Sequence, residues 1–208
     1  MIFNEDKIIH LRNAVKAKLS EKRYLHTLGV EQMAKHIGAI IMPDRLDELS
    51  VAALLHDVAK ELAYDEQIAL TKASGLDYTE EDLLTKPALH SFAAISVIKG
   101  DFSEYATADV LSAVANHTFG NAEMSLFDEI IFISDYTEQG RTYPSCVAVR
   151  EYLINNLSLK NNHKYNVKVL HQASLDATNS TVSSLQERGN LINSRTLKTK
   201  SFLEGLVK

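Results

Sequence analysis

The sequence predicts an all-α protein built from short helices around one core. Apolar residues recur at three- and four-residue spacing through most of the 208 residues, which is the pattern of packed amphipathic helices. Only three prolines and eight glycines interrupt this spacing, and no period-two alternation long enough for a sheet occurs before residue 160. With 45% hydrophobic residues a chain of this length can bury a substantial core, so we expect a single domain.

The first three helices follow from apolar stripes and breakers. One stripe covers residues 8–19, and the next covers residues 25–40 and stops before Pro43. Asp44 or Asp47 then begins a third helix, which runs through an almost wholly apolar stretch. A helix of this kind is expected to lie in the protein interior.

The same spacing predicts the next elements of the domain. Further helices are expected at residues 65–74, 80–85, 88–99, 104–116, 125–138 and 144–158. Thr79 and Asp82 can exchange hydrogen bonds as a cap for the helix at 80–85.

The end of the chain is predicted to be a loop after Asn161 and one last helix capped by Ser174. We assign residues 1–188 to the domain and residues 189–208 to a basic C-terminal tail. Because chain ends are often mobile, this tail is expected to be solvated or frayed.

Charge and cysteine content exclude several classes of function. The 22 basic and 27 acidic residues give a net charge of -5, which argues against a nucleic-acid partner. Cys146 is the only cysteine, so no internal disulfide and no thiolate zinc site can form, and a cytoplasmic location is expected. The longest apolar runs fall far below the roughly 20 residues that span a bilayer, so no membrane association is expected.

The adjacent His56 and Asp57 are the first candidates for chemistry. They follow the apolar run at residues 51–55, at a depth where two ionisable side chains need partners. Lys60, one turn further on, offers a simple ion-pair partner for Asp57. The pair therefore indicates either an ordinary buried ion pair or a cation site.

Other side chains with metal-ligand atoms interrupt or end helices that otherwise have core composition. They are His26, His90, His117 and Asp135. Asp135 is the most informative, because a carboxylate among isoleucines and aromatic residues is rare unless a positive group faces it. The alternative is that Asp135 lies on a solvated face of its helix with Asp128 and Glu129.

Four imidazoles and two carboxylates suit Fe, Mn, Zn, Co or Ni and suit Ca or Mg poorly. Six ligands exceed what one catalytic metal with an open position uses. They favour two metals about 3.5–4 Å apart, bridged by a carboxylate and a solvent oxygen, which can clamp a phosphoryl group. The sequence contains no HExxH, EF-hand, P-loop or GxGxxG motif.

The order of these six residues resembles the H…HD…H…H…D pattern of HD-domain phosphohydrolases. More closely, the strings RYLHTLGV, AALLHDVAKE, LHSFAA and VLHQASLDATNS resemble the bacterial HD-domain symmetrical diadenosine tetraphosphatases. The segment from Asn116 to Tyr143 is the most specific part of this similarity, which runs over residues 20–180. Gln139 stands where the family has proline, a departure that we expect to leave the chemistry unchanged.

The resemblance implies an HD-domain helical bundle that hydrolyses diadenosine tetraphosphate (Ap4A) into two ADP, the reaction of a symmetrical bis(5'-nucleosyl)-tetraphosphatase. It implies two metal ions, most readily iron, with Mn, Co, Ni or Zn as alternatives. One metal would be held by His26, His56, Asp57 and Asp135. The second, bridged by Asp57, would be held by His90 and His117, and a hydroxide between the metals would be the nucleophile.

The resemblance also implies the groups that act on the substrate. Asp57, Lys60 and Asp135 would be catalytic, with the Lys60 ammonium offsetting charge on the leaving group. Arg23 and Arg141 would bind phosphates through their forked guanidiniums, alongside His26, Lys60 and Asp135. Taken singly, each of these basic side chains is more commonly a solvated surface residue.

The resemblance also implies a loop that closes over the nucleotide, and the alternative is a plain helix-capping loop. Its residues are Leu170, His171, Gln172, Ala173, Ser174 and Leu175. Thr118 and Glu138 are expected to orient His117 and Arg141. Tyr136 and Tyr143 are expected to lie in the core.

Other functions remain open at this stage. The metal pattern recognises phosphate and not a base, so a deoxynucleotide or a guanosine polyphosphate is an alternative substrate. A mixed-valence di-iron HD oxygenase, a non-catalytic nucleotide sensor and a purely structural helical protein are further alternatives. The basic residues beside the expected ligands favour a polyanionic substrate over a neutral one, and a homodimer is compatible with the sequence.

Overall fold

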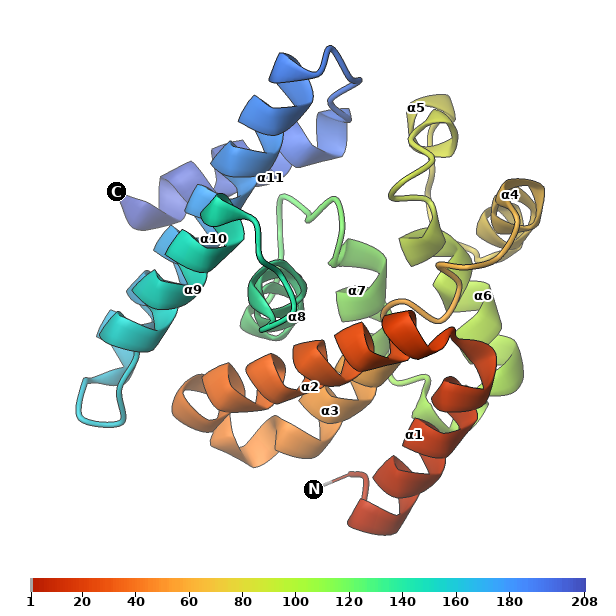
Figure 1. Ribbon diagram of the computed structural model, residues 1–208, viewed down its shortest axis with the longest axis horizontal. Helices are drawn as coiled ribbons and strands as arrows, with labels where there is room; N and C mark the ends of the chain where they lie inside the picture. Colours follow the sequence, from red (N-terminus) through yellow and green to blue (C-terminus); the bar gives the residue numbers. More distant parts are fainter. Residues whose placement is uncertain (1) are drawn as a thin grey trace.

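Eleven α-helices and two short 3-10 helices make up the computed structural model, which describes residues 2–208 (Figure 1). The α-helices are α1 (Glu5–Lys18), α2 (Glu21–Ile41), α3 (Leu46–Leu55), α4 (Tyr64–Ala73), α5 (Glu80–Leu84), α6 (His90–Asp101), α7 (Ala108–Asn116), α8 (Leu126–Thr137), α9 (Pro144–Asn156), α10 (His163–Glu187) and α11 (Ser194–Val207). The 3-10 helices are Pro43–Arg45 and Ser103–Tyr105. No strand occurs in residues 2–208, which confirms the all-α prediction.

Side-chain caps set several helix starts. Thr79 and Asp82 form the predicted capping box of α5. A second capping box, between Ser125 and Asp128, begins α8, so Asp128 is buried in this cap and does not lie on a solvated face as predicted. Thr107 caps α7, which separates the predicted helix at 104–116 into a 3-10 turn and an α-helix.

Helix α3 lies in the centre of the molecule. Its residues from Asp47 to Leu55 are all buried, and it packs against α1, α2, α7 and α8. Since α3 has no solvated face, the chain that leaves its C-terminal end starts inside the protein. This arrangement brings His56 and Asp57 into the interior, where they are 0% and 3% exposed.

The predicted loop at Leu170–Leu175 is wrong. These residues lie inside α10, an unbroken helix of 25 residues that is capped by Asn162 and not by Ser174. Val169, Leu170, Ala173 and Ala177 are buried at helical spacing, so they continue the apolar stripe across the polar residues between them.

The prediction of a frayed C-terminal tail is also wrong. Residues 194–207 form α11, which packs against α10 (Figure 1). Thr199 and Leu203 are fully buried, and the Arg195 guanidinium lies 3.0 Å from the Asp82 carboxylate at the start of α5. Within the described range, no helix is both long and apolar enough to cross a bilayer.

Candidate metal centre

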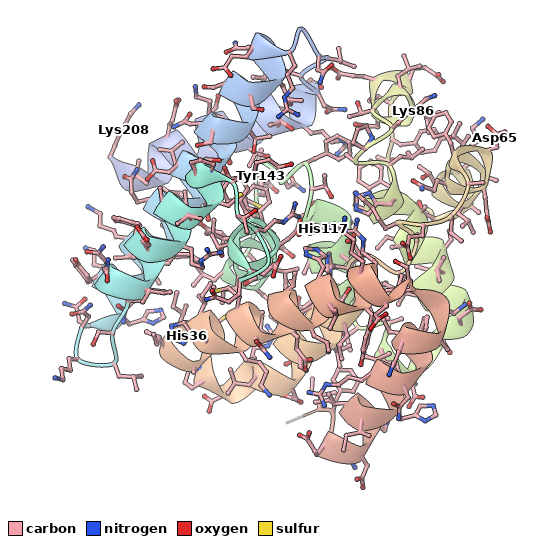
Figure 2. All side chains as sticks on the ribbon, viewed as in Figure 1. His36, Asp65, Lys86, His117, Tyr143 and Lys208 are labelled. Carbon is pink, nitrogen blue, oxygen red and sulfur yellow. The ribbon has the colours of Figure 1, made fainter. Side chains whose placement is uncertain are left out.

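Five helical segments bring the six predicted ligands together in the interior. His26 lies on α2, His90 is the first residue of α6, and Asp135 lies on α8. His56 and Asp57 follow α3, and His117 follows α7. Figure 2 shows His117 deep in the molecule, whereas His36 lies at the outer part of α2.

The Asp57 carboxylate lies at the centre of this cluster. Its Oδ2 atom is 3.4 Å from His56 Nε2 and 3.6 Å from His26 Nε2. Its Oδ1 atom is 3.0 Å from His90 Nε2 and 3.8 Å from His117 Nε2. The two oxygens therefore face two different pairs of imidazoles, which is the arrangement that a bridging carboxylate needs.

Two overlapping groups of ligand atoms are each compact enough to hold a cation. His26, His56 and Asp135 form one group, and His56, Asp57 and His117 form the other, with the ligand atoms of each within 4.8 Å of one another. Asp135 Oδ1 lies 3.0 Å from His26 Nε2. His90 Nε2 lies 3.1 Å from His117 Nε2 and 3.0 Å from Asp57 Oδ1, next to the second group.

Backbone carbonyls fix the orientation of two of the rings. The Nδ1 atom of His56 lies 2.6 Å from the Ala53 carbonyl, and that of His117 lies 2.7 Å from the Val114 carbonyl. Both Nδ1 atoms therefore carry the hydrogen, and both Nε2 lone pairs point into the cluster. His56 Nε2 is buried and has no hydrogen-bond partner among residues 2–208, so its lone pair is free to bind a cation.

In the metal-free protein, burial and charge hold Asp57 and His90 in the form that binds a metal and His26 in its protonated form. Burial alone would raise the pKa of Asp57, yet the imidazoles around it, His56 first, lower that pKa well below its ordinary value. Burial lowers the pKa of His90 to about 4, so this ring is neutral. Burial also disfavours the charged form of His26, but contacts with Asp135 and Glu138 raise its pKa to about 9.

Three cationic side chains surround the ligands. Arg23 Nη1 lies 2.8 Å from Asp57 Oδ2, and Arg141 Nη2 lies 2.6 Å from Asp135 Oδ1. The Lys60 ammonium lies 3.2 Å from His90 Nδ1, and burial lowers its pKa. Asp57 thus forms its ion pair with Arg23. It does not pair with Lys60, which the sequence offered as the alternative to a cation site.

Lys60 also donates a hydrogen bond to the Pro87 carbonyl at 2.9 Å. Asp135 is partly buried and engaged with His26 and Arg141, so the structure does not place it on a freely solvated helix face. Glu129, its predicted solvated neighbour, is fully buried and lies 2.8 Å from His171 Nδ1.

Thr118 and Glu138 lie beside the cluster, but their partners differ from those predicted. Glu138 Oε1 lies 3.2 Å from His26 Nδ1, and Glu138 Oε2 accepts a hydrogen bond from the Gly140 amide at 2.5 Å. The carboxylate also fills the space where a side chain at residue 29 would lie, so a Cβ there would displace the carboxylate. The Thr118 Oγ1 atom lies 3.5 Å from Nε2 of His90, which was not its predicted partner.

The residues at 170–175 occupy packing positions. Leu170, Ala173 and Ser174 are fully buried, and Leu175 packs with Met124 and Leu203. Gln172 hydrogen bonds to Asp176 within α10. Because the backbone here belongs to a helix, the segment is not a loop that closes over a ligand.

Two cavities adjoin the cluster. The first, of about 870 Å³, lies between α2 and the loop after α8 and is lined by Arg23, His26, Arg141 and Tyr143, among others. Tyr143 is 66% exposed, so the prediction that it lies in the core is wrong. We call this space the α2 cavity.

The second cavity, of about 480 Å³, lies between α5, α10 and α11, and we call it the α11 cavity. Its wall includes Pro87 and Thr118 beside the cluster, as well as Thr181 on α10 and Asn193 and Thr196 at the start of α11. The residues from α10 and α11 could not be predicted from the sequence, because no motif distinguishes them and they lie far along the chain from the candidate ligands.

Comparison with known proteins identifies the family. The sequence model of the HD-domain family matches residues 23–140, a range that contains all six candidate ligands. The chain belongs to the HD-domain family. This result confirms the predicted family and agrees with the helical architecture of this HD domain.

Two curated bacterial relatives are similar to this HD-domain protein over most of its length. The symmetrical bis(5'-nucleosyl)-tetraphosphatase of Halalkalibacterium halodurans is 32% identical over 149 residues, which cover 71% of this chain and 75% of the relative. That of Staphylococcus aureus is 31% identical over 150 residues, with the same coverage of 71% and 75%.

A solved structure shares the fold over almost the whole chain. It is the crystal structure of a predicted HD superfamily hydrolase involved in NAD metabolism from Clostridium acetobutylicum. Its TM-score is 0.80 at 27% sequence identity, and the match covers 98% of each chain. The helices outside the HD-domain match, including α10 and α11, therefore have counterparts in that hydrolase.

Proposed function

We propose that this protein is a metal-dependent phosphohydrolase that splits Ap4A symmetrically into two ADP. The observation that carries the proposal is the position of Asp57, whose two oxygens face separate pairs of imidazoles beside three cationic side chains. The names of the two tetraphosphatase relatives support the choice of Ap4A as the substrate.

The ligand set fits two metal ions, and we propose iron as the metal. His26, His56, Asp57 and Asp135 would hold one ion, and Asp57, His90 and His117 would hold the other. The buried Nε2 atom of His56, which lacks a hydrogen-bond partner among the described residues, supports this assignment. Two bound metals lower the pKa of a water molecule between them and neutralise phosphate charge.

The protein's own groups bind and orient the polyphosphate. Arg23 uses Nη1 on the Asp57 carboxylate, and Arg141 uses Nη2 on the Asp135 carboxylate and Nε on the Asp135 carbonyl. The remaining guanidinium N–H groups of both side chains are available for phosphate oxygens. The Lys60 ammonium lies beside His90, on the other side of Asp57 from His26, where it can offset the charge that develops on the leaving ADP. Three cations around the site favour a polyanionic substrate over the neutral substrate of an oxygenase.

The α11 cavity is suited to one nucleoside. Its volume of about 480 Å³ and its largely apolar wall are typical of a small-molecule pocket, and Thr118 connects it to the metal cluster. A nucleotide substrate and the buried free Cys146 also support a cytoplasmic location.

The test is anaerobic purification with metal analysis, followed by incubation with Ap4A and chromatography of the products. We expect two equivalents of metal and ADP as the sole product. ATP with AMP, or intact Ap4A, would contradict the proposal, and parallel incubations with dNMPs and guanosine polyphosphates would reveal a different phosphorylated substrate.

Matched variants connect turnover to the cluster. His56→Ala and Asp57→Ala should each lose both metal and activity, because each removes a central ligand. His36→Ala should keep both, because His36 is exposed and lies outside the cluster. Equal losses in all three variants would refute the ligand assignment.

A further inference from the structure

We infer that the α2 cavity binds the second nucleoside of the dinucleoside polyphosphate, with Tyr143 and Leu25 contacting its base. This inference rests on the proposed function, and it names a binding site for the half of the substrate that the α11 cavity does not hold.

The positions of the two cavities lead to this inference. The wall of the α2 cavity contains His26, which faces Asp57 Oδ2. The wall of the α11 cavity contains Thr118, which lies 3.5 Å from His90 Nε2, and His90 faces Asp57 Oδ1. The two cavities therefore adjoin opposite halves of the cluster, with Asp57 between them.

The symmetry of the reaction places a second nucleoside near the cluster. A cut at the central bond of a four-phosphate chain produces two ADP molecules, so one nucleoside lies on each side of the attacked phosphorus. Contacts with the second nucleoside, far from the reacting atoms, supply binding energy that only the dinucleotide can use.

The α2 cavity has the side chains that a purine needs. Tyr143 is 66% exposed and Leu25 is 61% exposed, and both line this cavity. An exposed aromatic ring offers a stacking surface, and the amide of Gln32 on the same wall can hydrogen bond to a base edge. Tyr143 lies at the N-terminal end of α9, where Figure 2 labels it.

The cavity also continues to the phosphate-binding groups. Arg23 and Arg141, which pair with Asp57 and Asp135, line it together with Tyr143. Its volume of about 870 Å³ lies within the usual range for a site that binds a ligand of nucleoside size. A polyphosphate at the cluster can therefore extend into the α2 cavity and place its nucleoside against Tyr143.

Steady-state kinetics of the metal-loaded enzyme give the first test. Because Tyr143 and Leu25 are exposed, Tyr143→Ala and Leu25→Ala should fold normally. Loss of the stacking surface should lower kcat/KM for Ap4A roughly 10-fold or more in Tyr143→Ala. Tyr165→Ala, on an exposed residue of α10, is the control and should leave kcat/KM unchanged. An unchanged kcat/KM in Tyr143→Ala would overturn the inference.

A binding measurement gives a second test that does not depend on turnover. The chain has no tryptophan, so Tyr143→Trp introduces a single fluorophore into the α2 cavity. Titration with an Ap4A analogue that carries a methylene group in place of the central bridging oxygen should change its fluorescence in a saturable way. The Tyr165→Trp variant is the control and should show no change.

The outcomes separate this inference from the proposed function. If the wild-type protein does not cleave Ap4A, the proposed function is wrong. If it cleaves Ap4A but Tyr143→Ala is fully active and the Tyr143→Trp variant shows no fluorescence change, the proposed function is supported. The inference of a second nucleoside site in the α2 cavity is then wrong.

Discussion

Each of three imidazoles in the cluster is held through its outer ring nitrogen, but the partners differ. His56 and His117 use the backbone carbonyls of Ala53 and Val114, which no side-chain substitution removes. His26 uses the carboxylate of Glu138, which is itself held by the Gly140 amide. Of these three rings, His26 is therefore the one whose orientation depends on a replaceable side chain.

Glu138→Gln should weaken metal binding without removing a ligand. The amide is a weaker acceptor for the His26 N–H than the carboxylate, so the ring loses both orientation and basicity. We expect the metal affinity to fall roughly 10- to 100-fold, measured by titration against a competing chelator. Glu151→Gln, on an exposed residue of α9, is the control. Equal affinities in the two variants would contradict this role.

The raised pKa of His26 predicts a pH-dependent stability of the metal-free protein. In the folded state this pKa is about 9, against an ordinary value of 6.5. The stabilisation by protonated His26 is therefore complete below pH 6.5 and is lost as the pH rises through 9. Compared with His26→Gln, the wild-type protein should gain up to about 3 kcal/mol near pH 6 and almost nothing above pH 10. Chemical unfolding of both proteins across this pH range measures the difference in their free energies of unfolding. A difference that does not change with pH would contradict the prediction.

At the scale of elements, α11 connects the C-terminal end of the chain to the cavity beside the cluster. Asn193 donates hydrogen bonds to Asp82 and Thr85, and Arg195 pairs with Asp82, so the start of α11 is fixed to α5. Thr199 Oγ1 donates to the Phe119 carbonyl, two residues after His117. The α11 cavity therefore keeps its shape only while α11 is packed.

Leu203→Ala tests whether α11 is an integral part of the domain. Leu203 is fully buried with Met124 and Leu175, so its truncation should lower the free energy of unfolding by about 2–5 kcal/mol. Leu206→Ala, on a residue that is 36% exposed, should change it by less than about 0.5 kcal/mol. Urea denaturation of both variants gives the values. If residues 194–207 were instead frayed, neither substitution would change the free energy of unfolding appreciably.

The elements show where sequence reasoning succeeds and where it fails. Apolar spacing predicted α1 to α9 because each of these helices buries one stripe or, like α3, is buried all round. It failed in α10, where His171, Gln172 and Ser174 interrupt the stripe and resemble a loop, although the helix continues. It failed again at α11, because Arg195 gains its partner Asp82 only through tertiary packing across 113 residues of sequence.

In the candidate site, too, some features follow from the local sequence and others only from the packing of helices. That the six candidate ligands cluster could be anticipated, because each is a ligand-type side chain in an apolar context, which is a local property of the sequence. The partners of Thr118 and Glu138 could not, since they depend on how helices distant in sequence pack together. The same limit applies to Tyr143, which lies next to an amphipathic helix but faces a cavity.

At the scale of the whole molecule, the cluster joins α2, α6 and α8 to the ends of α3 and α7. These elements are separated by loops and contribute one or two ligands each. A bound metal pair would therefore connect segments from position 26 to position 135 at the centre of the protein. Metal binding should consequently stabilise the entire fold.

Metal removal should lower the Tm. A ligand present at 100 times its Kd stabilises the native state by about 2.7 kcal/mol. In a protein of this size each kcal/mol shifts Tm by roughly 2–4 °C, so chelation should lower Tm by about 5–10 °C. Differential scanning calorimetry measures the shift. His36→Ala should respond to metal like the wild-type protein, whereas His56→Ala should not respond. If chelation still lowered the Tm of His56→Ala, the metal would bind outside the cluster.

We propose that Asp57 would hold two metal ions, one through each carboxylate oxygen. The most direct test is an anomalous difference map from crystals of the metal-loaded protein, collected at the absorption edge of the bound metal. The proposal predicts two peaks, one beside each oxygen of the Asp57 carboxylate, at the separation of about 3.5–4 Å that is usual for two-metal sites. A single peak, or two peaks that do not flank this carboxylate, would contradict it.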